Sequence, residues 1–210
     1  MSVENYITSS CSITRHTVYK NGQSIFVNVE TDMAGFLLSV YQYLQLKYTR
    51  FYKMDNLSKL GWLASEVLLK DDFQRDQYQS ETMGVILANS NASLDTDLKY
   101  AQSIHDIPSP SVFVYTLPNI MIGEICIRNH CKGETALFVF KHFDAEFMEQ
   151  YVNNLMNSST LQVCICGWVD LVENEYKAVL FLIEKGERNN KDIFSRENMN
   201  KRFQSETTAS

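Results

Sequence analysis

Short apolar stretches that suit strands alternate along this chain with longer segments of helical spacing. The expected strands are 6–14, 25–29, 83–87, 135–140, 161–171 and 176–183. The expected helices are 36–51, 56–69, 93–104, 118–128 and 145–156. Only Glu173-Asn174-Glu175 and its neighbours separate the last two strands, which predicts a hairpin. The pattern predicts an α/β fold, with a mixed central sheet flanked by helices.

The stretch 108–128, PSPSVFVYTLPNIMIGEICIR, organises this pattern. Pro108 and Pro110 disfavour a helix in the residues around them, so we expect 109–115 to be an irregular or extended approach.

A buried helix is expected to follow that approach. Thr116 is a candidate N-cap and Pro118 suits a first helical turn. The apolar body of this helix consists of Ile120, Met121, Ile122, Ile125 and Ile127. Because Gly123 and Cys126 are small, we expect another element to approach the helix closely at these positions.

Helix start signals precede three other expected helices. They are Asp55 or Asn56, Ser93 and Asp144, all side chains that cap helices well. Asp144 follows a predicted strand directly, and a strand-turn-helix junction is a common place for a nucleophile. The dense aromatic residues within 36–51 are interpreted as a packing surface rather than as a ligand site.

Charge and composition exclude several classes of function. The chain has 210 residues, a net charge of −6 and no basic stripe, so we expect no nucleic-acid or anionic-membrane partner. No long uncharged apolar run and no signal peptide are recognised, so cytoplasmic localisation is the expectation. An acidic carrier protein would need a local basic patch to bind this chain.

Five cysteines, Cys11, Cys126, Cys131, Cys164 and Cys166, are scattered through expected core elements, which favours reduced thiols over a disulfide framework. Zinc is the rival interpretation. Cys164 and Cys166 would share one face of a strand, and His130 adjoins Cys131, but the sequence contains no CxxC pair. We therefore expect no metal site, and no motif indicates a cofactor.

Several segments in order resemble the N-terminal half of β-ketoacyl synthases. The resemblance rests on 108–133 with its TLPN and glycine turn, on 53–60, on MGVILANS at 83–90 and on ASLDTDLKY at 92–100. It covers about residues 6–184 and implies a thiolase-like fold. We accordingly divide the chain into a β-ketoacyl-synthase-like domain, 1–184, and a polar C-terminal tail, 185–210, with a short docking segment and a frayed end.

The same resemblance implies that the nucleophilic cysteine is absent. Counting forward from Asn119, or back from Gly167, places His142 where the synthases carry that cysteine. Phe143 is bulky where the family has a small residue, and Trp168 replaces the second glycine of a Gly-Gly pair. The catalytic histidines of the synthases come from a second half that has no counterpart here. An ordinary ketosynthase reaction by this chain alone is therefore not expected.

Two interpretations of His142 remain open. It could hydrogen-bond a thioester carbonyl or assist decarboxylation of a malonyl group, or it could be an ordinary polar turn residue.

Three functions follow as hypotheses. The first is a non-catalytic accessory or partner subunit in acyl-carrier-dependent fatty acid, polyene or polyketide biosynthesis. The second is an acyl-thioester decarboxylase or acyltransferase that uses His142 or residues of a partner. The third is a stand-alone scaffold or ligand-binding protein. A half-length fold leaves apolar surface uncovered, so we expect a homo-oligomer or a heteromer with a ketosynthase-like subunit, and an acyl carrier protein as a further partner.

Overall fold

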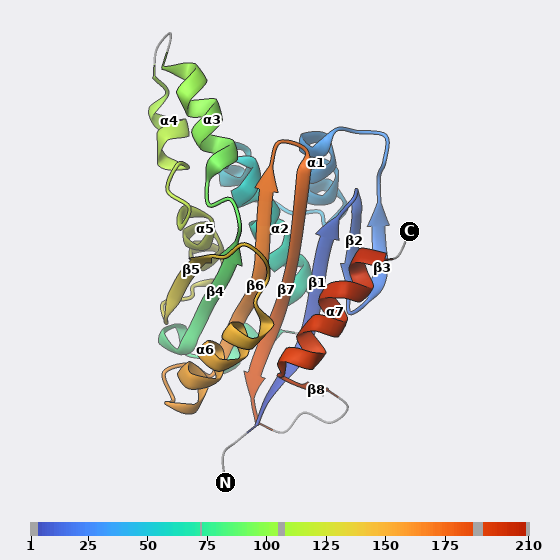
Figure 1. The fold of residues 1–210 in the computed structure, drawn as a ribbon, viewed down its shortest axis with the longest axis vertical. Helices are drawn as coiled ribbons and strands as arrows, with labels where there is room; N and C mark the ends of the chain where they lie inside the picture. The colour runs from blue at the N-terminus through green and yellow to red at the C-terminus, as the bar shows by residue number, and fades with distance from the viewer. Residues whose placement is uncertain (1–3, 72, 105–107, 187–190, 209–210) are drawn as a thin grey trace.

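One mixed sheet forms the centre of the computed structural model, which describes residues 4–71, 73–104, 108–186 and 191–208 (Figure 1). Its strands are β1 (Asn5–Thr14), β2 (Thr17–Lys20), β3 (Gln23–Val27), β4 (Met83–Asn89), β5 (Thr135–Val139), β6 (Val163–Val172), β7 (Glu175–Lys185) and β8 (Asp192–Ile193). Their order is β3-β2-β1-β7-β6-β4-β5, and β8 pairs with β1. β4 is parallel to β5 and β6, whereas the other pairs are antiparallel. The predicted mixed sheet and the β6–β7 hairpin are confirmed.

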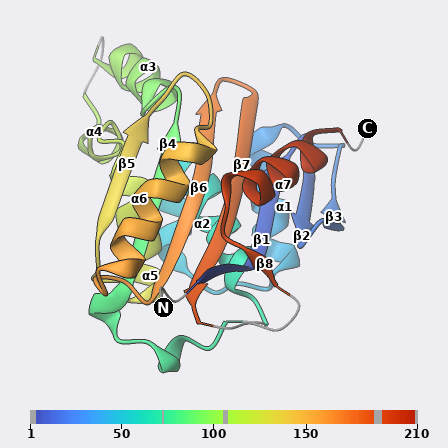
Figure 2. The ribbon, with the colours of Figure 1, turned by 60° about the horizontal axis from the view of Figure 1, so that its bottom comes forward.

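Helices cover both faces of this sheet (Figure 2). They are α1 (Met33–Tyr43), α2 (Asn56–Leu69), α3 (Leu94–Ser103), α4 (Pro110–Val114), α5 (Ile120–Asn129), α6 (Ala145–Asn157) and α7 (Arg196–Thr208). α1, α2 and α5 pack on one face, and α6 and α7 on the other. α3 and α4 form an arm that projects beyond the end of the sheet, on the side where β5 lies (Figure 1).

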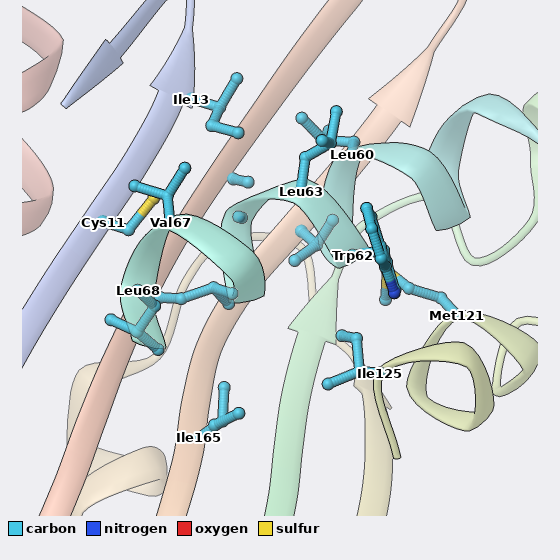
Figure 3. Packing of buried hydrophobic residues seen from close by; sticks show 14 of the residues in the cluster. Cys11, Ile13, Leu60, Trp62, Leu63, Val67, Leu68, Met121, Ile125 and Ile165 are labelled. Carbon is cyan, nitrogen blue, oxygen red and sulfur yellow. The ribbon is translucent and has the colours of Figure 1, made fainter. Parts of the chain in front are cut away.

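The α2 helix lies directly on the sheet, as its apolar spacing predicts (Figure 3). Asp55 caps it by accepting a hydrogen bond from the Ser58 N–H. Gly61 lets α5 approach, because a Cβ at this position would lie 2.6 Å from Met121 Sδ. Gly123 on α5 has no atom within 4 Å of such a Cβ. The expected close approach at Gly123 is therefore wrong, since the glycine between the two helices lies on α2.

The two helices on the other face of the sheet, α6 and α7, are apolar toward the sheet and polar toward solvent. α6 buries one stripe of side chains, Ala145, Met148, Val152 and Met156, while Glu146, Gln150 and Asn154 face solvent. α7 likewise buries Met199 and exposes Arg196, Glu197, Asn200 and Lys201. The apolar surface expected of a half-length fold is therefore not on these helices.

Residues 109–115 are mostly helical, contrary to the expectation of an irregular or extended approach. Ser109 caps α4 by accepting from the Val112 N–H at 3.4 Å, and Pro110 occupies the first turn. Proline suits this position because the first N–H groups of a helix have no partner within the helix. Pro110 thus starts this helix instead of breaking it.

Two further expectations need correction. The helix expected over 36–51 ends at Tyr43, and a 3₁₀ turn (Thr49–Lys53) brings the Phe51 ring back onto the Tyr41 ring, 4.3 Å between centroids. α5 begins at Ile120 without a side-chain cap and is only half-buried, since Ile127 is exposed. The interpretation of the aromatic residues as a packing surface agrees with this arrangement.

β5 was expected to be a buried strand, but it lies at the edge of the sheet. Thr135 and Val139 are exposed and the three residues between them are half-buried. A strand at the edge of a sheet has one neighbour instead of two, and this position cannot be read from the apolar run TALFV alone.

The segment after Glu184 contains more regular structure than its polarity indicates. Lys185 completes β7, β8 adds a short pairing to β1, and α7 follows. Phe194 and Met199 are buried against the α6 face of the sheet. The docking segment is thus formed by β8 and α7, while the boundary at residue 184 stays a prediction.

Candidate functional site

His142 lies in the loop between β5 and α6, at the strand-turn-helix junction that the sequence indicates. The Phe140 N–H donates to the Asn89 carbonyl at 2.9 Å, which extends the β4–β5 pairing to the start of this loop. Asp144 caps α6 by accepting from the Phe147 N–H at 2.9 Å. His142 itself is exposed, and its side chain makes no hydrogen bond or ion pair to any residue that the structure describes.

Aromatic rings fill the space beneath this loop. The Phe143 ring stacks on Phe203 of α7, with centroids 4.6 Å apart, and lies 6.4 Å from both Trp168 and Phe181. Phe181 is fully buried and Trp168 is 6% exposed. An acyl chain entering below His142 would have to displace this cluster of rings.

The Gly167-Trp168 pair lies on β6 beside that cluster. Gly167 has a φ of 147°, and a Cβ there would lie 2.1 Å from the Val179 carbonyl oxygen of β7. This close approach requires glycine at position 167. Trp168, in contrast, projects its ring toward Phe143 and occupies volume that a glycine would leave open.

Outside the loop there is an open hollow of about 670 Å³ between the β5–α6 junction and α7. Polar and charged side chains line much of it, among them Lys141, His142 and Glu146, and Arg196 forms an ion pair with Glu146 at 3.3 Å. Asp144 and Glu146 place negative charge at the start of α6, where an anionic ligand would otherwise be favoured. This hollow suits a solvated surface better than an oxyanion or thioester site.

The cysteines do not assemble with His142. Cys11, Cys164 and Cys166 are fully buried on strands, and Cys164 and Cys166 share the α6 face as predicted. Burial raises the pKa of both the Cys164 and the Cys166 thiol, which makes them poor nucleophiles. Across the described ranges, no three His, Cys, Asp or Glu residues lie close enough together to hold a metal ion.

One polar centre was missed by sequence reasoning. Asp170, on the otherwise apolar β6, accepts hydrogen bonds from both the backbone N–H and the side chain of Ser90 and of Asn91, at 2.7 to 3.1 Å. A carboxylate within an apolar strand indicates that the carboxylate has hydrogen-bond or ionic partners in the fold. Its partners in the loop after β4 could not have been found from sequence spacing.

Further hydrogen bonds fix the base of the α3–α4 arm. Ser93 donates through Oγ to the Thr116 carbonyl at 2.6 Å, which joins α3 to the segment after α4. Asp95 accepts from the Glu173 N–H of the β6–β7 turn at 3.2 Å and pairs with Lys99 at 2.6 Å. The arm is therefore held in a defined orientation on the sheet.

The arm carries most of the exposed large apolar side chains on this side of the molecule. We call these six residues the arm surface, each 41 to 53% exposed: Leu94, Leu98, Ile104, Phe113, Val114 and Leu117. Val139, at the end of the edge strand β5, is 56% exposed. Exposed apolar side chains and an open strand edge are both typical of a protein-protein interface.

Comparisons with known proteins identify the fold. No protein-family model and no curated protein matches the chain. Among solved structures, the ishigamide ketosynthase/chain length factor matches with a TM-score of 0.63 at 17% identity, over 90% of this chain and 64% of that one. This chain has a thiolase-like ketosynthase fold.

Two other ketosynthase structures match in the same way. One is a type II polyketide synthase acyl-carrier protein in complex with its ketosynthase bound to the hexaketide (AntDE:AntF), with a TM-score of 0.66 at 12% identity, over 88% of this chain and 64% of that chain. The other is the ketosynthase ApeO in complex with its chain length factor ApeC from Xenorhabdus doucetiae, with a TM-score of 0.56 at 13% identity, over 88% of this chain and 80% of that chain.

The ketosynthase-fold chain thus spans less than two thirds of the length of the first two matched chains. Identities this low establish a common fold and leave the activity to be argued from the site. Among the described helices, none has both the length and the apolar composition needed to cross a membrane.

Proposed function

We propose that this chain is a non-catalytic, ketosynthase-like subunit that pairs with a ketosynthase-like partner in acyl-carrier-dependent biosynthesis of fatty acids, polyenes or polyketides. Its place of action in this proposal is the cytoplasm. An acyl carrier protein would deliver substrate to the assembled complex, where the partner supplies the nucleophile and the polarising residues.

The observation that carries this proposal is the aromatic packing beneath His142. Decarboxylative condensation needs a thiolate to hold the acyl group and a pocket that accommodates it. Position 142 supplies an exposed imidazole instead, and Phe143, Trp168, Phe181 and Phe203 fill the interior below it. In this proposal, the junction lacks the reactive group and its aromatic rings occupy the space that a substrate would need.

The open edge of β5 supports a partner. Its five residues, TALFV, include no charge and no proline, and the register with β4 contains no bulge, so the usual devices that protect an edge strand are lacking. The opposite edge, β3, has an irregular register at Val18/Tyr19 that disturbs its pairing. A partner protein that adds a strand to β5 would also come close to the arm surface.

The matched structures give this arrangement a precedent. One of them is described as a ketosynthase in complex with its chain length factor, and another as a ketosynthase with an acyl-carrier protein. Because our chain has their fold but a net charge of −6, we infer that an acidic carrier binds chiefly to the partner subunit.

The alternative of an acyl-thioester decarboxylase or acyltransferase uses His142 with residues lent by the partner. It is favoured only by the accessibility of the imidazole beside an open hollow. His142→Ala in the reconstituted complex separates the two: loss of product formation with the complex intact supports the alternative, and unchanged product formation supports the accessory role.

Purification of the chain from its native cells tests the proposal directly. We expect a complex of fixed stoichiometry whose second component, identified by mass spectrometry, is a ketosynthase-like protein with a nucleophilic cysteine. Recovery as a monomer or a bare homo-oligomer would contradict the proposed role and favour a stand-alone scaffold.

A further inference from the structure

The C-terminal end of α5 brings two cysteine side chains together. His130 has a left-handed backbone conformation with φ of 54°, and the Cys131 N–H donates to the Cys126 carbonyl at 3.1 Å. This is the Schellman cap, in which the side chains of the residues at these two positions commonly contact each other. The two thiols lie close enough for each to shift the pKa of the other. The backbone itself therefore holds this thiol pair together.

A guanidinium group lies next to the same cap. Arg75 donates to the Asn129 carbonyl at 2.9 Å and to the His130 carbonyl at 3.2 Å, the two residues that precede Cys131. Its other hydrogen bonds, to the Tyr78 carbonyl and to Ser80 Oγ, also reach neutral oxygens. Within the described part of the chain, no carboxylate pairs with Arg75, so its positive charge acts on the cap.

The surroundings shift the pKa values of the two thiols in opposite directions. The hydrogen bond that Cys126 donates, together with the charge of Arg75, lowers the pKa of Cys131 although burial opposes this. The pKa of Cys126 is raised, first because its proton is held in that hydrogen bond. Cys131 is thus the thiol of the pair that loses its proton more readily, and Cys126 is the thiol that can react with it after oxidation.

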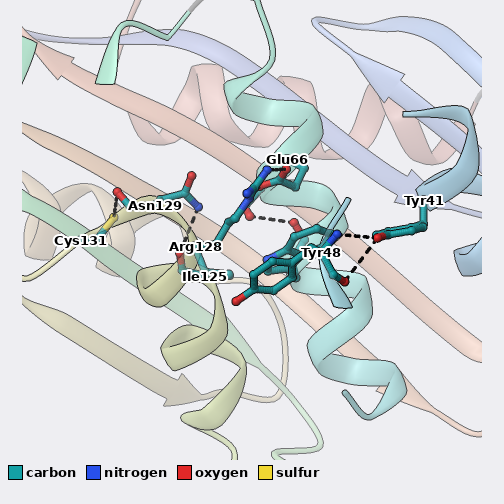
Figure 4. A network of polar contacts seen from close by, with 9 residues as sticks. Tyr41, Tyr48, Glu66, Ile125, Arg128, Asn129 and Cys131 are labelled. Carbon is teal, nitrogen blue, oxygen red and sulfur yellow. Dashed lines mark hydrogen bonds and ion pairs between the residues drawn. The ribbon is translucent and has the colours of Figure 1, made fainter. Parts of the chain in front are cut away.

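Access to the pair favours a small oxidant. Cys131 is 7% exposed and Cys126 is partly exposed, whereas the other three cysteines are completely buried. Figure 4 shows Cys131 just beyond the end of α5, where its Sγ donates a hydrogen bond to the Asn129 carbonyl at 3.9 Å. A bulky disulfide would not reach this sulfur easily, but a peroxide would.

We propose that Cys131 and Cys126 form a hydroperoxide-reactive pair that closes to an intramolecular disulfide. The Cys131 thiolate attacks one oxygen of hydrogen peroxide, the O–O bond breaks, and the released hydroxide takes up a proton to become water. The Cys126 thiol then attacks the resulting sulfenic sulfur, the S–O bond breaks, and the hydroxyl leaves as water with the Cys126 proton. The peroxide is reduced to water and both thiols are oxidised.

The disulfide would tether the last turn of α5 to the segment that leads into β5. Cys131 is followed by a tight turn at Gly133, where a Cβ would lie 2.7 Å from the Met83 carbonyl oxygen, and β5 starts at Thr135. This inference concerns the isolated chain and does not depend on the proposed partner or pathway.

The test is a timed oxidation of the full-length protein with hydrogen peroxide, followed by alkylation of the remaining thiols and peptide mapping. We expect a product lighter by two hydrogens that contains a disulfide between Cys126 and Cys131. It should form at least about tenfold faster than oxidation of Cys11, Cys164 or Cys166. Equal rates at all five cysteines, or a disulfide from Cys131 to Cys164, would overturn the proposal.

Two variants refine this test. Cys126→Ser replaces the partly exposed thiol and should stop the reaction at a Cys131 sulfenic acid, which dimedone captures. Cys11→Ala removes a buried thiol on β1 and should leave disulfide formation unchanged. Absence of dimedone capture at Cys131 in the first variant, or loss of the disulfide in the second, would contradict the assigned roles.

Discussion

The ring of Phe143, next to His142, stacks on the ring of Phe203 in the C-terminal helix at 4.6 Å, with 10° between their planes. The loop between β5 and α6 is thereby packed against α7, a helix whose sequence is mostly polar. The ammonium group of Lys177, on β7, lies over the Phe203 ring, 3.6 Å from its centroid. The C-terminal helix thus takes part in filling the space below the junction.

Phe203→Ala should therefore destabilise the whole domain rather than only the end of the chain. The change removes one stacked pair and one cation–π contact, and we expect a loss of about 1–3 kcal/mol in the free energy of unfolding. Urea unfolding measures this loss. Leu117→Ala, at a side chain that is 53% exposed on the arm, is the control and should change stability by less than about 0.5 kcal/mol.

The two helical glycines give opposite expectations for the same substitution. Gly61→Ala forces a Cβ against Met121, so we expect a loss of about 1–3 kcal/mol from overpacking between α2 and α5. Gly123→Ala meets no atom within 4 Å and should stabilise the protein by up to about 1 kcal/mol through better helix propensity. Thermal unfolding of both variants checks this pair, and a stabilising Gly61→Ala would refute the packing of α5 on α2.

The sequence was a good guide where the physics is local. Apolar spacing and caps such as Asp55 and Asp144 placed α2 and α6 correctly, because a cap and an apolar stripe act within one helix. It failed where the outcome depends on neighbours far along the chain. The edge position of β5, the docking of α7 and the hydrogen bonds to Asp170 are all long-range. The same reason limits the candidate site: the β5–α6 junction with His142 follows from local pattern, whereas the packing of Phe203 beneath it does not, and the role of His142 stays a prediction.

Asp170→Asn should loosen the base of the arm. An amide has one oxygen in place of two and directs an NH₂ group toward the N–H donors of Ser90 and Asn91. We expect a loss of about 1–3 kcal/mol in unfolding free energy and faster amide hydrogen exchange in α3. Asp76→Asn, at an exposed aspartate, is the matched control and should do neither. Unchanged exchange in α3 would show that Asp170 does not hold the arm.

The titration of Tyr115 makes the free energy of unfolding depend on pH in the alkaline range. Burial, followed by the neighbouring Glu124 carboxylate, raises the pKa of Tyr115 to about 12, against about 10 in an unfolded chain. The folded state therefore retains a proton that the unfolded state loses. The stabilisation is complete below pH about 10 and disappears as the pH rises to about 12.

Tyr115→Phe isolates this contribution. The variant lacks the hydrogen bond to Glu124 Oε1, 3.2 Å in the native protein, and has no proton to titrate. Between pH 9 and 12 its unfolding free energy should fall less steeply than that of the native protein, as followed by urea titration at each pH. Parallel curves for the two proteins would rule out Tyr115 as the titrating group.

Val139 and Val27 offer the sharpest test of the central claim that β5 is the partner edge. Both are the last residues of edge strands, at opposite ends of the strand order, and they are 56% and 55% exposed. Lysine at either position should leave the fold intact, since each side chain already faces solvent. A lysine on an edge strand opposes the addition of another strand.

The most direct measurement is the affinity of the ketosynthase-like partner for Val139→Lys and Val27→Lys, by native mass spectrometry and titration calorimetry on the purified complex. We predict that Val139→Lys weakens the complex about tenfold or more, equivalent to about 1.4 kcal/mol, while Val27→Lys binds like the native chain. Equal binding by both variants, or a loss confined to Val27→Lys, would contradict the account.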